Sequence, residues 1–435
     1  MRQAQIEPNN IRGVESMFND LTTLVIAVVF VAINGLTMLA WAAAQGYKMK
    51  PTAFAFLVGA VGNLLTGSVT PISGQSSILT VSHFMKNVNE RIAALLLAVL
   101  VMVPLGLTGS VTRIADFAGQ PVLWGMMAGV GLMVMGISFD MMKQAKRTGI
   151  IAFVSALATY AAFVIATPAG TPRNPHALVY VIAVSVTLAT IDFVFLQKDP
   201  ETGKRGRRVD LLKMAKDAGY EGDMEQNENP KFWTKEYWAE FKLMKPKLSI
   251  NAIYFALAFI CLNIGTNIAF GNITAGFGAR DAYGVLINPQ NMDHLTVINS
   301  LADIPSVIFG GAPVGAIISA TAAAPWPVMA GVLMMLLCAI LLLLGLMVKA
   351  IKYVPVQAIA GFLFIIGFFS TFMPNLRNVF FVPPAHAVFR DAVSPHDAVA
   401  SATAMAVTAL TKNPFLGLVG GVAIRYIGEF FFLVI

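Results

Sequence analysis

The side chains best suited to bind a ligand in this sequence are small and polar, and they interrupt otherwise apolar stretches. Serine, threonine, asparagine and glutamine supply hydrogen-bond donors and acceptors, and glycine lets a ligand approach the backbone. Polar clusters inside apolar runs favour a site for a small polar molecule, because such groups are costly to leave in lipid. The candidate binding residues are Ser73, Gly74, Gln75, Ser76, Asn263, Thr266, Asn267, Gly315 and Ser319.

Ionisable side chains are scarce within the apolar stretches, where Asp192 and Asp303 are the clear examples. An acid at such a position is a functional candidate. Asp192 lies near the end of its stretch, so Asp303 is the candidate for coupling to a proton or a sodium ion. We find no Ser/His/Asp arrangement, phosphate loop or cluster of metal ligands. The sequence therefore predicts a protein that is not an enzyme and that binds no cofactor or metal beyond such a coupling ion.

The composition indicates which class of protein must position these residues. Of the 435 residues, 57% are hydrophobic and 12% are charged, whereas soluble domains carry about 25% charged residues. Runs of about 20 apolar residues, enough to cross a bilayer, recur along the chain. These features exclude a soluble enzyme and a nucleic-acid partner, and they predict an integral, multi-pass membrane protein. We expect full spans near residues 21–45, 52–70, 91–112, 121–142, 148–168, 175–196, 248–271, 292–310, 326–348, 355–374, 395–411 and 414–434.

Two further stretches, 71–86 and 312–325, are too short and too polar or small to cross alone. We interpret both as half-helices whose positive N-terminal ends face a common cavity. A second pair of related strings, AGVGL at 128–132 and AGFL at 360–363, follows in the same order. Matching breaks in two halves are typical of secondary transporters with inverted repeats. The alternative is that small residues merely let helices pack closely.

These observations predict an all-α membrane protein with 14 transmembrane segments in a 7+7 inverted repeat. Its parts are an N-terminal tail (1–20), a first repeat (21–196), a polar loop (197–247) and a second repeat (248–435). Between Pro230 and Pro246 aromatic residues alternate with charged ones, which favours a helix at the membrane interface over a partner-binding helix. The loop holds 12 of the 30 Lys and Arg residues, so the charge distribution predicts that it is cytoplasmic.

Several strings resemble the nucleobase–ascorbate (xanthine/uracil permease) transporter family. They are Val69–Gly74 (VTPISG), 121–139 (PVLWGMMAGVGLMVMGISF), Phe309–Val314 (FGGAPV) and Val354–Ala358 (VPVQA). The likeness is nearest to the adenine/guanine/hypoxanthine permease branch and to uracil permease, and more distant to the sulfate-permease family. It implies a uracil-permease-like fold, elevator-type movement, a homodimer, and substrate held between the third, eighth and tenth segments. The family keeps its termini cytoplasmic, whereas the charge count predicts that both termini lie outside. Ser319 stands where the family usually carries a glutamate, the acidic position of the eighth segment falls near Leu262 or Asn263, and Asn299 aligns with an acid that some permeases carry.

The leading hypothesis is a secondary active transporter in the plasma (inner) membrane, a symporter for a nucleobase-like or other small polar solute. The first alternative is a small-anion transporter of the same fold, for sulfate, bicarbonate or a carboxylate. A further alternative is a scaffold or sensor derived from such a transporter. In each case the lipid bilayer is the expected surrounding partner.

Overall fold

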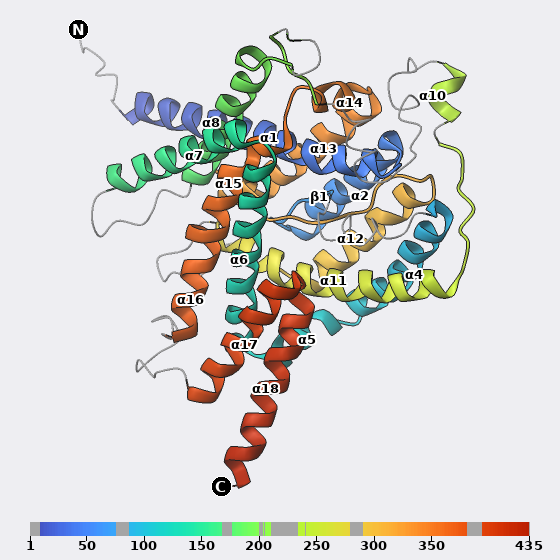
Figure 1. The fold of residues 1–435 in the computed structure, drawn as a ribbon, viewed down its shortest axis with the longest axis vertical. Coiled ribbons are helices and arrows are strands. Elements are labelled where there is room, and N and C mark those ends of the chain that lie inside the picture. The colour runs from blue at the N-terminus through green and yellow to red at the C-terminus, as the bar shows by residue number, and fades with distance from the viewer. Residues whose placement is uncertain are drawn as a thin grey trace, which may run out of the picture.

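Helices surround one short β-ribbon in the computed structural model of this chain (Figure 1). The structure describes residues 9–434 except 75–86, 168–175, 200–202, 204, 210–233, 240, 279–289 and 381–393. The elements before the polar loop are α1 (Asn9–Ala44), α2 (Met49–Thr66), β1 (Ile72–Gly74), α4 (Val88–Leu107), α5 (Ser110–Ala118), α6 (Gln120–Gln144), α7 (Lys146–Ala166), α8 (Ala177–Ile191) and the π-helical turn η1 (Asp192–Leu196).

The polar loop contains α10 (Lys235–Ala239), and the remaining elements follow it. They are α11 (Ile250–Gly276), α12 (Met292–Val307), β2 (Val314–Ala316), the 3-10 turn η3 (Ala320–Ala323), α13 (Pro327–Leu343), α14 (Leu346–Ile351), η4 (Val356–Ile359), α15 (Ala360–Phe364), the π-helical η5 (Ile365–Phe372), α16 (Met373–Phe380), α17 (Pro395–Thr411) and α18 (Pro414–Val434). Each of the twelve full spans expected from the sequence coincides with a helix or, near 91–112, 175–196, 326–348 and 355–374, with consecutive helical elements.

Helix starts follow local sequence signals. The side chains of Asn87, Ser249 and Asn291 accept hydrogen bonds from backbone N–H groups in the first turns of α4, α11 and α12. These polar residues stand directly before apolar runs, where a side-chain acceptor satisfies N–H groups that have no partner within the helix. The caps therefore fix where three of the helices begin.

Six of the described helical stretches are long and apolar enough to cross a membrane. They are Val88–Leu107, Gln120–Gln144, Lys146–Ala166, Ala177–Leu196, Ile250–Gly276 and Val356–Phe380. Many large apolar side chains on them face outward, among them Leu100, Ile150 and Ile165. Exposed apolar side chains on such helices suit contact with lipid. The chain is therefore a multi-pass membrane protein with a mostly helical fold.

The related strings at 128–132 and 360–363 lie on α6 and α15, and the glycines in and just after them allow close helix packing. Gly125 and Gly129 of α6 lie against the backbone of Ser401 and Met405 on α17. A Cβ added to Gly131 would lie 2.7 Å from the Gly367 carbonyl, and one added to Gly367 would lie 2.8 Å from the Gly131 carbonyl. Larger side chains would separate these helices. Glycines from the two halves of the chain thus lie against each other.

Two described aromatic residues of the polar loop, Tyr237 and Phe241, pack on the protein, and the interfacial helix over 230–246 stays a prediction. The described helical part of this stretch, α10, has five residues. Tyr237 is buried, its hydroxyl donates to the Leu343 carbonyl (2.9 Å), and the Lys50 ammonium lies 4.4 Å from its ring centroid. Phe241 packs against Phe54 of α2. Tyr237 therefore contacts protein, whereas Trp238 is exposed.

Candidate functional site

The described start of the first broken segment, residues 71–74, meets the second segment through paired strands, and the rest of the expected half-helix, 75–86, lies outside the described residues. β1 and β2 pair antiparallel with Ile72 opposite Ala316, Ser73 opposite Gly315 and Gly74 opposite Val314. Beyond the strands, Ile317 N donates to the Pro71 carbonyl (3.2 Å). All six strand residues are buried, and Figure 1 shows β1 in the middle of the molecule. Non-helical backbone is tolerated at membrane depth only where protein surrounds it or it lines a cavity.

The expected half-helix at 312–325 is therefore wrong. Its described residues form β2, an extended stretch and the four-residue turn η3. Ser319 is buried, and its Oγ lies 2.8 Å from Thr321 Oγ1 and accepts from Thr321 N at 3.2 Å. The serine caps its own turn. Alanine by itself favours a helix, so the pairing with β1 overrides the local preference at Val314–Ala316.

Ser73 is one of two described binding candidates, with Asn263, whose side chains keep a buried polar atom without a hydrogen-bond partner. Ser73 is 1% exposed, and its Oγ has no hydrogen-bond partner. It faces Gly35 of α1, where an added Cβ would lie 2.9 Å from the hydroxyl oxygen. A Cβ added to Gly74 would lie 3.2 Å from the Cβ of Met38, which is also on α1. Gln75 and Ser76 lie outside the described residues.

Asp303 of α12 holds β2 in place. Its Oδ1 accepts a hydrogen bond from Val314 N at 2.7 Å, and the residue is 3% exposed. The loop before β2 is fixed in the same way, since the Ser306 hydroxyl donates to the Ala312 carbonyl (2.7 Å) and Ala312 N donates to Thr52 Oγ1 (2.8 Å). An acid beside a break in helical backbone thus supplies an acceptor that the broken segment needs.

The polar cluster on α11 is largely engaged with its own helix and with α12. The Thr266 hydroxyl donates to the Leu262 carbonyl (2.8 Å). Asn267 Nδ2 donates to Thr296 Oγ1 (3.0 Å), and Asn299 Nδ2 donates to Asn267 Oδ1 (2.6 Å). The interhelical explanation therefore accounts for Asn267. It leaves the site role of this residue without geometric support.

This network also fixes the orientation of the Asn299 amide. The Thr296 hydroxyl donates to the Met292 carbonyl (2.8 Å), so its oxygen must act as the acceptor for Asn267 Nδ2. Asn267 then presents its oxygen to Asn299 Nδ2, which leaves Asn299 Oδ1 without a partner. Asn263 Oδ1 is likewise buried without a partner. Buried acceptors of this kind are costly unless a ligand or water satisfies them.

Asp192 lies near the end of its span, as expected from the sequence, and it forms an ion pair there. Its carboxylate accepts from Arg147 Nη2 at 2.6 Å and from Gln197 Nε2 at 2.6 Å. The sequence reading missed a third acid, Asp293, which lies in the first turn of α12. Its Oδ1 accepts from Val111 N (2.9 Å) and Thr112 N (3.3 Å) at the start of α5. The sequence feature that could have identified Asp293 is its position two residues after Asn291, at the boundary of an expected span.

A cavity of about 350 Å³ lies beside Asp293, away from the predicted site residues. It opens between the ends of α2, α4 and α12, and its lining is mostly apolar. The lining residues are Thr66, Gly106, Leu107, Gly109, Asn291, Asp293, His294, Val297 and Ile298. In the part of the chain that the structure describes, no group of three or more His, Cys, Asp or Glu side chains could hold a metal ion.

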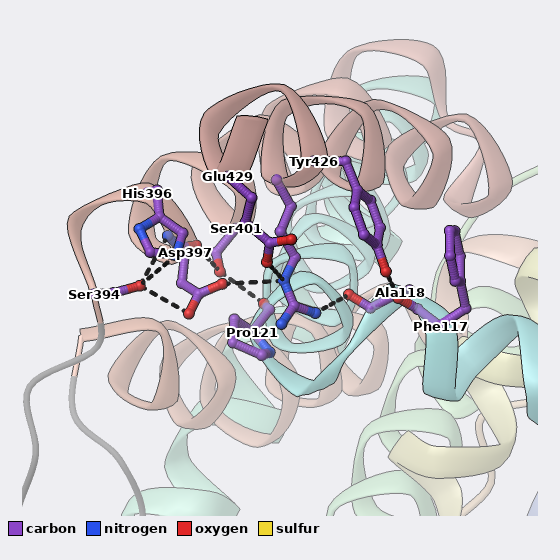
Figure 2. Close-up of polar contacts among 10 residues, drawn as sticks. Phe117, Ala118, Pro121, Ser394, His396, Asp397, Ser401, Tyr426 and Glu429 are labelled. Atoms are coloured by element: carbon purple, nitrogen blue, oxygen red, sulfur yellow. Dashed lines mark hydrogen bonds and ion pairs between the residues drawn. The ribbon is translucent and has the colours of Figure 1, made fainter. Parts of the chain in front are cut away.

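A serine, a histidine and an aspartate do meet at the start of α17 (Figure 2). Ser394 Oγ lies 3.2 Å from His396 Nε2 and donates to Asp397 Oδ2 at 2.8 Å. In a catalytic triad the histidine lies between serine and aspartate and removes the serine proton. Here the serine lies between the other two and also accepts from Asp397 N (3.3 Å). The arrangement is a helix N-cap.

Arg425 of α18 completes this polar group. Its Nε lies 3.3 Å from Asp397 Oδ1 and 3.4 Å from Glu429 Oε1, and its Nη1 donates to the Ala118 carbonyl (3.0 Å). Gly119 lies against the guanidinium and has no room for a side chain. The arginine thus joins α17 and α18 to the turn between α5 and α6. The sequence gives no local signal for this link, because its partners lie far apart in the chain.

Comparisons with known proteins leave the family open. No protein-family model matches the chain, and no curated protein matches it. The transmembrane domain of a cyanobacterium bicarbonate transporter, BicA, is similar in structure, with 14% identity and a TM-score of 0.47 over 93% of this chain and 98% of that one. SLC26A9 is similar with 14% identity and a TM-score of 0.43 over 94% of this chain and 64% of that one. These comparisons lend no support to the nucleobase-permease branch.

Proposed function

We propose that this protein is a membrane transporter for a small polar solute, and that the β1–β2 ribbon forms the centre of its binding site. The observation that carries the proposal is the buried, unpartnered Ser73 hydroxyl on non-helical backbone within a bundle of membrane-spanning helices. Broken backbone and uncommitted polar groups at such depth are typical of solute sites in transporters. Elevator-type alternating access by a homodimer remains the proposed mode of action.

The cargo that we propose to test first is a small anion, such as bicarbonate, sulfate or a carboxylate. The predicted site residues include one carboxylate, Asp303, and its Oδ1 already accepts from Val314 N. A nucleobase needs acceptors for its N–H groups, whereas an anion needs donors, which the Ser73 hydroxyl supplies. Gly35, Gly74 and Gly315 keep the ribbon free of bulky side chains. The resemblance to the sulfate-permease family agrees with this choice.

A nucleobase-like solute is the second candidate, and a specific observation favours it. Asn299 Oδ1 and Asn263 Oδ1 are buried acceptors without partners. An N–H donor on the solute would satisfy them, whereas an anion without a proton, such as sulfate or a carboxylate, would not. A coupling proton or sodium ion is proposed for either cargo, with Asp303 as the candidate for coupling.

The test is uptake by proteoliposomes that contain the purified chain. The panel holds labelled bicarbonate, sulfate, formate, uracil, adenine and hypoxanthine. We expect uptake of an anion, competition by other anions, and loss of at least tenfold in the Ser73→Ala variant through a higher KM. Ser155→Ala is the matched control, because this hydroxyl donates to its own helix at Ile151 (2.7 Å). Uptake of bases alone would favour the second candidate. No uptake or binding by folded protein would overturn the transporter proposal and favour a scaffold or sensor.

A further inference from the structure

One end of the helix bundle carries a concentration of basic side chains. The end of α6, the start of α7, the segment after η1 and the α14 region lie together there, since Arg207 Nη1 donates to Gln197 Oε1 (3.3 Å) and Val209 N donates to the Lys352 carbonyl (2.7 Å). The described residues within 140–148, 192–209 and 346–353 hold three acidic side chains and nine basic ones. The basic residues, which we call the basic surface, are Lys143, Lys146, Arg147, Lys198, Arg205, Arg207, Arg208, Lys349 and Lys352.

Nine basic and three acidic side chains leave the described part of this surface with a net positive charge. Asp192 pairs with Arg147 (2.6 Å) and Asp140 with Lys143 (3.2 Å). Four exposed side chains have no ion-pair partner among the described residues: Lys146, Lys198, Arg205 and Arg208. Lys198 and Arg205 are partners in an antiparallel β-bridge, so the backbone places two like charges side by side. Like charges at such a separation repel unless an anion lies near them.

Lipid-facing side chains lead directly to this surface. Leu188, Ile191 and Phe195 on α8 and η1 are 46%, 43% and 65% exposed, and Lys198 follows within one turn's length. On α7, Ile150 and Val154 are 50% and 57% exposed and come directly after Lys146. Acyl chains that cover these apolar side chains place their phosphate groups at the level of the lysines and arginines.

We infer that the basic surface binds the headgroups of anionic phospholipids. The exposed apolar residues of α7, α8 and η1 contact the acyl chains, and Lys146, Lys198, Arg205 and Arg208 contact the phosphates. Basic side chains near a bilayer surface attract anionic lipid by about fivefold in affinity per charge. A soluble partner does not explain why the charges adjoin lipid-facing side chains. The inference does not depend on the proposed transport activity.

The experiment measures lipid retention by the full chain in detergent with native mass spectrometry, together with the thermal shift on lipid addition. The probes are phosphatidylglycerol, phosphatidylcholine and soluble glycerol phosphate. The variant is Lys198→Gln/Arg205→Gln. The matched control, Lys242→Gln/Lys245→Gln, removes the same charge from exposed positions of the polar loop.

We expect phosphatidylglycerol to bind the unmodified chain and the control, and the variant to lose roughly twentyfold in affinity, since two charges are removed. Phosphatidylcholine should bind all three chains alike. Equal retention by variant and control would overturn the inference, as would stabilisation by glycerol phosphate equal to that by the lipid. The melting temperature without lipid shows whether each variant is folded. A variant that melts early is replaced by Lys146→Gln/Arg208→Gln, for which the same outcomes apply.

Discussion

Ser73 and Gly315 lie opposite each other in the antiparallel β1–β2 pair, so the residues that open the two broken segments are direct neighbours. Gly131 and Gly367, which belong to the second pair of related strings, also lie against each other. The Ser73–Gly315 contact joins a position in the first half of the chain to its counterpart in the second, whereas Gly131 and Gly367 are not counterparts. A contact between counterparts arises where two related halves meet at a twofold axis. The Ser73–Gly315 contact supports the proposed inverted repeat, which remains a prediction.

The contact between Gly35 and Ser73 predicts a steric effect that a second substitution relieves. In Gly35→Ala the new methyl group lies 2.9 Å from Ser73 Oγ, and overpacking of this kind costs about 1–3 kcal/mol. Removing the oxygen in Gly35→Ala/Ser73→Ala should restore much of that stability. Thermal unfolding in detergent measures both effects. Gly136→Ala is the control, because no atom lies within 4 Å of its added Cβ, and it should be as stable as the unmodified chain or more so.

Asp303 has a structural role that two substitutions separate from ion coupling. Asp303→Ala leaves the buried Val314 N–H without its acceptor, which should lower the free energy of unfolding by about 1–3 kcal/mol. Asp303→Asn retains an oxygen acceptor and should lose less. If Asp303 couples transport to protons, the asparagine variant should still bind solute but no longer respond to a pH gradient in proteoliposomes. An unaltered response in that variant would remove Asp303 as the coupling residue.

Asn267 and Asn299 should depend on each other for stability. Their amides share a 2.6 Å hydrogen bond between α11 and α12, and neighbouring groups in one network show coupling of about 0.5–3 kcal/mol. A double-mutant cycle with alanine at both positions measures this coupling in thermal or denaturant unfolding. Asn272, whose amide donates to Ile268 of its own helix (2.9 Å), provides the control pair with Asn299. Additive effects for Asn267 and Asn299 would contradict the described network.

The Arg425 link should contribute to stability through charge. In Arg425→Met, Asp397 and Glu429 lose their cation and the Ala118 carbonyl loses a donor. Because these groups are partly exposed, we expect a loss of about 1–2 kcal/mol at low salt. The loss should shrink at high salt, where exposed charges are screened. Arg113→Met on α5 is the control, and its melting temperature should equal that of the unmodified chain. Equal melting of both variants at all salt concentrations would show that the link adds nothing.

The positions of the spans could be predicted because they depend on local composition. Apolar runs between polar or small residues define α4, α6 and α11, and Asn87 and Ser249 mark two of the starts. The meeting of 71–74 with 312–316 could be predicted from the similarity of the two breaks. Their strand conformation could not, because it depends on pairing between segments that are remote in the sequence.

The candidate site was predicted less well than the spans. Polar residue type shows that a side chain needs a partner, but it does not show which partner the fold provides. Asn267 finds Thr296 and Asn299, and Ser319 finds Thr321. Among the described site candidates, Ser73 keeps an uncommitted hydroxyl and Asn263 an uncommitted amide oxygen. The contacts of Arg425 and the burial of Tyr237 against the helices depend on partners that are distant in the sequence. Neither could be predicted from local residues.

The β1–β2 pair also sets an order for the biosynthesis of the molecule. β2 lies roughly 240 residues after β1, and ribosomes add about 5–20 residues per second. The backbone of β1 must therefore wait roughly 12–48 seconds for its partner while the first helices are already entering the bilayer. Unpaired backbone groups are costly in lipid. Until β2 is made, water, the insertion machinery or a chaperone must therefore supply temporary partners for the backbone of β1. A chain cut within the polar loop should accumulate only when both fragments are made in the same cell.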